Sequence, residues 1–175
     1  MIPNMRSGKN SLKPFLDWLP NPGLLVLEVG CFGGDGTVEF LECDKVDFLC
    51  CVDPYEGGYD KGDTASGCDM SEALQKWAEQ VSQRRGSKPV SLHIGQTIYD
   101  LPDTERFDLC YIDGNHREEF VRADILHCLE MFQPKIIAGH DYGVGKHPGV
   151  KAAVDKIFGT ADLNLFPDTS WSIIL

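Results

Sequence analysis

Basic residues are scarce in this chain. Its 175 residues include 16 Lys and Arg against 27 Asp and Glu, which gives a formal net charge of −11. A protein that grips a phosphate backbone needs clustered Lys and Arg. The only such cluster, Arg84, Arg85 and Lys88, falls at a predicted helix end, where cations suit the helix dipole. We therefore expect a small-molecule substrate, neutral or cationic, and no nucleic-acid partner.

Long apolar runs and paired cysteines are also missing. Charges or turn residues interrupt every apolar run before it could span a membrane, and the N-terminus lacks the apolar stretch of a signal peptide. The seven cysteines include no C-x-x-C pair, and Cys50, Cys51 and Cys110 stand inside apolar runs, where cysteine behaves as a small hydrophobe. These features predict a cytoplasmic protein with reduced thiols and no membrane partner. They leave both a monomer and a homo-oligomer open.

The chain contains no internal repeat or linker, and its length suits one domain, residues 1–175, with residues 1–22 as an N-terminal helical extension. Unbroken apolar runs alternate with helical segments, which is typical of parallel strands buried on both faces. We predict an α/β, Rossmann-like three-layer sandwich closed by an antiparallel hairpin. The predicted strands are 24–29, 48–53, 90–94, 107–112, 135–139 and two short strands around Pro167 and Asp168, and the predicted helices are 11–19, 36–41, 70–84, 117–131 and 148–158.

Local signals add detail to three of these helices. Asp69 is placed to cap the helix from residue 70, while Pro148 and Gly159 suit the first turn and the position after the last turn of the final helix. The helix over 117–131 is predicted to bury one side made of Phe120, Val121, Ala123, Leu126, Leu129 and Met131.

Polar residues follow every predicted parallel strand. In an open α/β sheet, ligands bind beyond the carboxyl ends of the strands, so we expect the site among residues 28–37, 53–55, 95–97, 113–116 and 140–142. The long polar segment Glu56–Cys68 is either a lid over this site or a disordered surface loop.

The loop after the first strand has the spacing acid-x-Gly-x-x-x-Gly, formed by Glu28, Gly30 and Gly34. A dinucleotide loop needs G-x-G-x-x-G so that the pyrophosphate meets backbone N–H groups, and Phe32 breaks that pattern. A carboxylate near the loop suits a cationic amino-acid moiety instead. Asp53, at the end of the second strand, can accept both hydroxyls of a ribose, but an NAD enzyme would use the same acid.

Four segments, LEVGCFGGDGT, CVDPY, FDLCYIDGNH and IIAGHDYGVGKHPGVKAAVDKIF, resemble the successive motifs of class I S-adenosylmethionine-dependent methyltransferases. The similarity covers residues 24–175, and its nearest branch, related to catechol O-methyltransferase-like enzymes, carries Asp-Gly-x-His and His-Asp-Tyr motifs. The resemblance implies a seven-stranded, mostly parallel sheet in the order 3-2-1-4-5-7-6 with one antiparallel strand. It also implies S-adenosylmethionine as the cofactor.

The resemblance assigns a role to each motif position. Gly30, Cys31, Phe32 and Gly34 would line the methionine half of the cofactor with Glu28 nearby, Asp53 would hold the ribose, Gly95, Gln96 and Thr97 would border the adenine, and Asp113 would face the methyl donor and the substrate. O-methylation of a small metabolite is the expected reaction. The alternatives are a methyltransferase-like module that binds cofactor without turnover and an NAD-dependent oxidoreductase.

Methyl transfer from a sulfonium requires alignment and removal of a proton from the nucleophile. His116, three residues after Asp113, is the candidate base, because an imidazole can accept a proton at neutral pH. Its alternative roles are to cap the following helix or to pair with Glu119.

A divalent metal is the second device that could activate a hydroxyl. Asp113, His140 and Asp141 are candidate ligands, with His116 and His147 within reach. This set resembles the magnesium site of catechol O-methyltransferases, but those enzymes carry Asp-Asn where this chain has His140-Asp141. A histidine ligand shifts the preference toward softer divalent ions.

Overall fold

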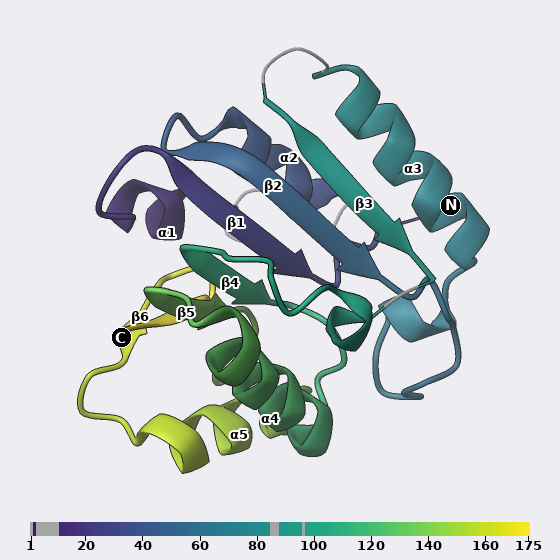
Figure 1. The fold of residues 1–175 in the computed structure, drawn as a ribbon. Coiled ribbons are helices and arrows are strands. Elements are labelled where there is room, and N and C mark those ends of the chain that lie inside the picture. The colour runs from purple at the N-terminus through teal and green to yellow at the C-terminus, as the bar shows by residue number, and fades with distance from the viewer. Residues whose placement is uncertain (1, 3–10, 85–87, 96) are drawn as a thin grey trace.

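A computed structural model describes residues 2, 11–84, 88–95 and 97–175. In this part of the chain seven strands form one sheet in the order β3-β2-β1-β4-β5-β7-β6 (Figure 1). Their bounds are β1 Leu24–Val29, β2 Val46–Asp53, β3 Val90–Ile94, β4 Leu109–Ile112, β5 Ile136–Gly139, β6 Asn164–Leu165 and β7 Trp171–Ile174. Strand β7 runs antiparallel to β5 and β6, whereas β1 to β5 pair in parallel. The predicted fold, strand order and single antiparallel strand are confirmed.

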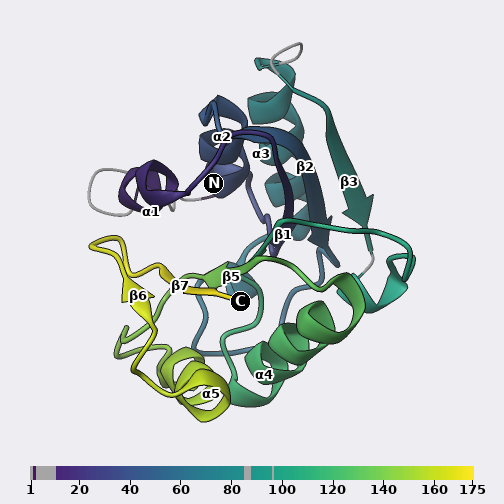
Figure 2. The ribbon, with the colours of Figure 1, turned by 60° about the vertical axis from the view of Figure 1, so that its left-hand side comes forward.

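Helices cover both faces of the sheet (Figure 2). One face packs against α1 Lys13–Trp18, α2 Asp35–Glu42 and α3 Met70–Ser82, and the other against α4 Glu118–His127 and α5 Pro148–Phe158. Neighbouring residues of one strand therefore enter different cores: Val26 lies in the first and Leu27 in the second, both fully buried. This explains why the central strands read as unbroken apolar runs.

The predicted caps of α3 and α5 are confirmed. The Asp69 carboxylate accepts the backbone N–H groups of Ser71 and Glu72, Pro148 begins α5, and Gly159 follows its last residue. The cap on α3 satisfies two of the N–H groups that a helix start leaves without partners. Of the basic cluster predicted after α3, Arg85 lies outside the described residues.

The predicted buried side of the fourth helix is wrong in half of its members: Phe120, Ala123 and Leu126 are exposed, whereas Val121 is buried and Leu129 and Met131 pack partly buried against the core. Phe120 and Leu126 are each 45% exposed, and α4 passes at Cys128 into a π-helical turn that ends at Phe132. The side chains that face the sheet are Val121, Ile125, Cys128 and Phe132, all of them buried. These residues recur every three or four positions. The predicted helical period is therefore right, but the side of the helix that faces the sheet differs from the predicted one.

All seven cysteines lie in the described part of the chain and carry free thiols, and Cys50, Cys51 and Cys110 are buried in the core as predicted. Within the residues described, no helix has the length and apolar character that crossing a membrane would need.

Candidate functional site

The site lies at the carboxyl ends of the parallel strands, where the loops after β1, β2, β4 and β5 meet. A cavity of about 440 Å³ opens on the β2 side and one of about 290 Å³ on the β5 side. Both are lined by Gly30, Phe32, Asp63, Ala65, Asp113 and His116. The two cavities are therefore adjacent and share these six residues as a common wall.

The loop after β1 needs glycine at two positions for steric reasons. Gly30 has φ +85°, and a Cβ there would lie 2.5 Å from the Asp113 carbonyl oxygen. Gly34, at the N-cap of α2, has φ +84°, and its Cβ would come within 3.1 Å of Trp77. Glycine adopts the positive φ of both residues without strain, and at Gly30 it also leaves room for the Asp113 carbonyl oxygen. Gly34 packs on α3, and neither described cavity includes it in its lining.

Asp53, at the end of β2, is hydrogen-bonded to the β1 loop and lines the larger cavity. One carboxylate oxygen accepts the N–H of Phe32 at 2.8 Å and the other accepts the N–H of Tyr55 at 2.7 Å. Phe32 and Tyr55 both have positive φ, 41° and 49°, so these bonds maintain strained backbone of the kind that clusters at functional sites. Burial raises the pKa of Asp53, and the two bonds oppose that shift.

The far end of the larger cavity is bounded by Thr97, Ile98, Tyr99, Phe120 and Asp124. The Tyr99 hydroxyl donates to Asp124 at 3.2 Å, and burial raises the pKa of Asp124 to about 6. Of the three residues predicted to border an adenine, Thr97 lines this cavity, Gly95 is absent from its described lining and Gln96 lies outside the described residues.

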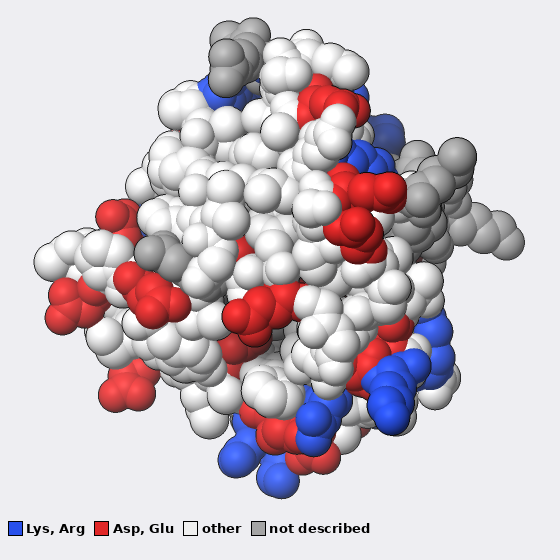
Figure 3. Space-filling view, turned by 90° about the vertical axis from the view of Figure 1, so that its right-hand side faces the viewer, with Lys and Arg blue, Asp and Glu red and all other residues white. Residues whose placement is uncertain are grey.

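The smaller cavity is rich in carboxylates. Glu28, Asp35, Asp63, Asp113 and Asp141 line it together with Lys146. On the face toward which the strands in Figure 1 point, acidic side chains flank a central hollow (Figure 3). Glu28 is 3% exposed, and one of its oxygens accepts the Thr37 hydroxyl at 2.6 Å. This concentration of negative charge favours a cationic ligand group.

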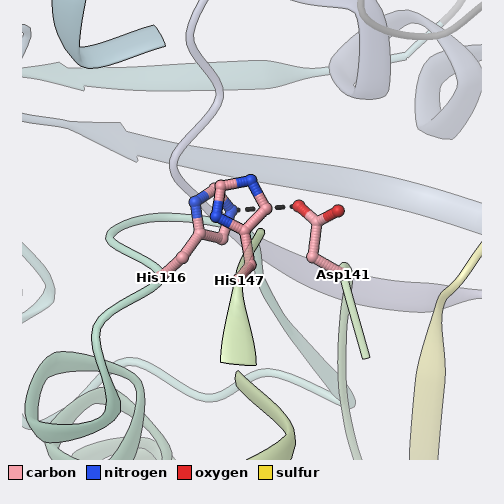
Figure 4. A group of neighbouring side chains, drawn as sticks. All are labelled: His116, Asp141 and His147. Carbon is pink, nitrogen blue, oxygen red and sulfur yellow. Dashed lines mark ion pairs between the residues drawn. The ribbon is translucent and has the colours of Figure 1, made fainter. Parts of the chain in front are cut away.

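Histidines and aspartates from four segments line this cavity. Figure 4 shows three of them, His116, Asp141 and His147. His116 Nδ1 lies 2.8 Å from Asp63 Oδ2, and His116 Nε2 lies 3.0 Å from Asp141 Oδ2 and 3.8 Å from Asp113 Oδ1. His140 Nδ1 lies 3.4 Å from Asp141 Oδ2. The His147 ring lies against the His116 ring, with 3.9 Å between centroids.

The carboxylates decide the charge of His116. Burial by itself would lower its pKa, but the proximity of Asp113, Asp141 and Asp63 outweighs burial and raises the pKa to about 11. The same contacts hold the pKa of Asp141 well below its usual range, against the effect of burial. The two alternative roles of His116 are wrong: α4 has no side-chain cap, and Glu119 pairs with Arg117.

The cluster has the composition of a metal site. One set of possible ligand atoms comes from Asp113, His140 and Asp141, and a second from His116, Asp141 and His147; the atoms of each set lie within 4.8 Å of one another. Asp141, shared by both, has φ +61°. The buried Nε2 of His116 makes no hydrogen bond of acceptable geometry within the described part of the chain. It forms an ion pair with Asp141 at 3.0 Å, and histidine nitrogens among carboxylates are a donor set that fits a divalent cation.

Sequence reasoning missed Asp63. It lies in the segment between β2 and α3, 6% exposed, and lines both cavities. No motif marks this residue, and the only signal was the unusual length of the segment around it. That segment is folded over the site, which favours the lid over the disordered loop.

Comparisons with known proteins identify the family and the fold. The sequence profile of a family described as "Methyltransferase domain" matches residues 27–142. No curated protein matches the chain. The structure is similar to that of CalS11, a calicheamicin methyltransferase, with a TM-score of 0.64 and 18% identity over 93% of this chain and 74% of that one.

Two further solved structures share the fold. A protein of the NADB-Rossmann superfamily from Streptococcus agalactiae has a TM-score of 0.58 and 11% identity over 96% of this chain. A putative methyltransferase from Thermoplasma acidophilum has a TM-score of 0.51 and 17% identity over 76% of this chain. The chain spans 66% of the first protein and 50% of the second.

Proposed function

This chain belongs to the family of methyltransferase domains, and on that basis we propose that it transfers a methyl group from S-adenosylmethionine to an oxygen atom of a small molecule. The observation that carries the proposal is the contact between two cavities at Asp113 and His116. One cavity offers a ribose-binding carboxylate, and the other offers a cluster of potential proton acceptors and metal ligands. A methyl donor and its acceptor would meet at the shared wall.

The cofactor would lie along the β1 loop. Asp53 would accept the ribose hydroxyls in the larger cavity, with Thr97 toward the adenine, while Gly30, Cys31 and Phe32 would border the methionine half. A cofactor contact rests on the family resemblance alone for three of the predicted residues: Gly34, Gly95 and Gln96. Glu28, in the smaller cavity, would attract the cationic amino group of the methionine.

A dinucleotide fits this loop poorly. Its pyrophosphate would sit at the N-terminus of α2, but Asp35 occupies the first turn of that helix and is paired with Lys76 at 2.8 Å. Glu28 would add a second negative charge next to the phosphates. This charge arrangement supports S-adenosylmethionine over NAD.

Methyl transfer is an in-line displacement. A lone pair of the acceptor oxygen attacks the methyl carbon, the carbon–sulfur bond breaks with its electron pair left on sulfur, and the hydroxyl proton passes to a base. His116 Nε2, at the wall between the cavities, is the proposed proton acceptor, and Asp113 would orient the acceptor hydroxyl. The base must be a neutral imidazole, so the negative charge of Asp113 and Asp141 has to be compensated in the working enzyme.

The donor set fits a divalent cation held by Asp113, His140 and Asp141. A bound cation would lower the pKa of a coordinated hydroxyl and offset the carboxylate charge. The imidazole of His140 favours a transition metal over magnesium. His116 cannot serve both as base and as ligand through Nε2, because Asp63 already takes Nδ1.

Calorimetry with S-adenosylhomocysteine tests the cofactor, with NADH as the comparison ligand. We expect binding of the first and none of the second at high micromolar concentration. Transfer of a labelled methyl group to a panel of sugars, catechols and other phenols then tests the reaction, before and after dialysis against a chelator. His116→Ala should lower turnover by roughly 10²–10⁴-fold while leaving S-adenosylhomocysteine binding nearly unchanged. Binding without transfer to any acceptor would favour a non-catalytic module.

A further inference from the structure

We propose that Asp63 is the positioning residue of the proton acceptor, and that it makes His116 competent only while residues 56–68 of the β2–α3 loop are closed over the site. This inference rests on the proposed function, because it concerns how the base of that reaction is assembled. The contact joins segments that are distant in the sequence: Asp63 stands in the loop, and His116 follows β4.

The Asp63 carboxylate is held at both oxygens. Oδ1 accepts the backbone N–H of Ala65 at 2.8 Å, and Oδ2 accepts Nδ1–H of His116 at 2.8 Å. The Tyr59 hydroxyl lies 3.4 Å from Oδ2. With 6% of its surface exposed, Asp63 makes these bonds largely out of water. A charged, buried hydrogen bond of this kind is stronger than a neutral one.

The bond fixes which nitrogen of His116 reaches the reacting atoms. Because Asp63 takes Nδ1–H, the remaining nitrogen, Nε2, points toward Asp113 and Asp141, where the cavities meet. The Asp63 carboxylate would also stabilise the imidazolium that forms when Nε2 accepts a proton. A buried aspartate thus orients the imidazole of a histidine base and stabilises its protonated form.

The loop depends on the same bond for its closed position. Inside the loop, Gly58 N–H donates to the Ser66 carbonyl at 2.8 Å and Asp60 N–H donates to the Ser66 hydroxyl at 2.9 Å, so the segment forms a unit of its own. Among the hydrogen bonds of residues 56–68 within the described part of the chain, the one from His116 to Asp63 is the bond that leaves the segment. Opening the loop would therefore remove the partner of Nδ1.

The closed loop also forms part of both cavity walls. Asp63 and Ala65 line the larger and the smaller cavity alike. A loop that opens would expose both cavities to solvent, and a loop that closes would orient His116 in the same movement. Exclusion of water and assembly of the base are thus coupled through one side chain.

Asp63→Asn removes the charge with little change in shape, and Asp60→Asn is the matched control. Asp60 stands in the same loop and accepts the N–H of Gly62, a bond that an asparagine oxygen can keep. Neither described cavity includes Asp60 in its lining. Both variants lose one negative charge from the loop. Only Asp63→Asn also changes a contact with His116.

The first readout is the ring N–H proton of His116 in ¹⁵N-histidine-labelled protein saturated with S-adenosylhomocysteine. We expect a protected, far-downfield resonance that is assigned by its loss in His116→Ala and persists in Asp60→Asn. In Asp63→Asn it should move upfield or disappear, because the single amide oxygen carries no charge and cannot accept from both Ala65 and His116. An unchanged resonance in Asp63→Asn would overturn the proposal. Calorimetry with S-adenosylhomocysteine distinguishes the two hypotheses. If the wild type binds no S-adenosylhomocysteine, the proposed function is refuted; if it binds and the resonance is unchanged in Asp63→Asn, only the role of Asp63 is refuted.

The second readout is methyl transfer to the acceptor that the panel identifies. Asp63→Asn should lower kcat by roughly 10²–10⁴-fold while the KM for S-adenosylmethionine stays within about threefold. Asp60→Asn should keep kcat within about twofold. In a His116→Ala background Asp63→Asn should cost nothing more, because a residue that acts through another has no effect without it. Additive losses would mean that Asp63 acts independently of His116.

Discussion

Replacing Asp53 by alanine should weaken S-adenosylhomocysteine binding by about a hundredfold. Two hydrogen bonds from ribose hydroxyls to a carboxylate are lost, and each bond to a charged group contributes about 1.5 kcal/mol or more. A total near 3 kcal/mol corresponds to roughly two factors of ten in the dissociation constant. The substitution also frees the N–H groups of Phe32 and Tyr55, whose positive φ angles of 41° and 49° the carboxylate helps to maintain. Some further loss through the β1 loop is therefore expected.

The assay is calorimetry on protein whose folding is first checked by circular dichroism. Asp103→Ala, which removes an exposed carboxylate that lines neither described cavity, is the control and should bind as wild type does. Asp53→Asn should lie between the two, because its amide retains one acceptor oxygen. If Asp53→Ala binds within about twofold of wild type, the ribose does not lie at the end of β2 and the placement of the cofactor is wrong.

Three more predictions test the loops and the larger cavity. Gly30→Ala should lower the free energy of unfolding by at least about 2 kcal/mol in thermal denaturation, because its Cβ would lie 2.5 Å from a backbone oxygen at φ +85°; wild-type stability would contradict the close approach. Burial raises the pKa of Asp124 to about 6, so the folded state favours its protonated form, and the stability this gives is complete below about pH 4 and lost as the pH rises through about 6. Asp124→Asn should remove that part of the pH dependence in denaturant titrations, and an unchanged profile would refute the assignment. Trypsin should cleave after the exposed Lys61 at least about tenfold faster in Asp63→Asn than in wild type, since the loop loses its bond to His116; equal rates would mean that this bond does not hold the loop closed.

The sequence by itself determined the fold and the edge of the sheet at which the two cavities lie. Strands buried on both faces show as unbroken apolar runs, because each neighbouring residue meets one of two cores. The glycine at position 30 and the acid at position 53 were also readable, since a sharp turn and a carboxylate at a strand end are local requirements. Local causes of this kind leave local signals.

The orientation of α4 on the sheet could not be predicted from local sequence patterns. Apolar residues lie on more than one side of this helix, and the sequence does not say which side the sheet will cover. The structure buries Val121 and Ile125 and leaves Phe120 exposed in the lining of the larger cavity. Packing against the sheet and the π-helical turn at Cys128 decide this choice.

Only the tertiary structure placed Asp63 against His116. The two residues are 53 positions apart, no spacing rule connects them, and the loop that carries Asp63 has no regular pattern. The sequence already placed His147 within reach of the candidate metal ligands, but its ring contact with His116, made from the start of α5, is seen only in the structure. Strand ends share an edge by the rules of the sheet, but the path of a long loop is set by the contacts it makes once the sheet has formed.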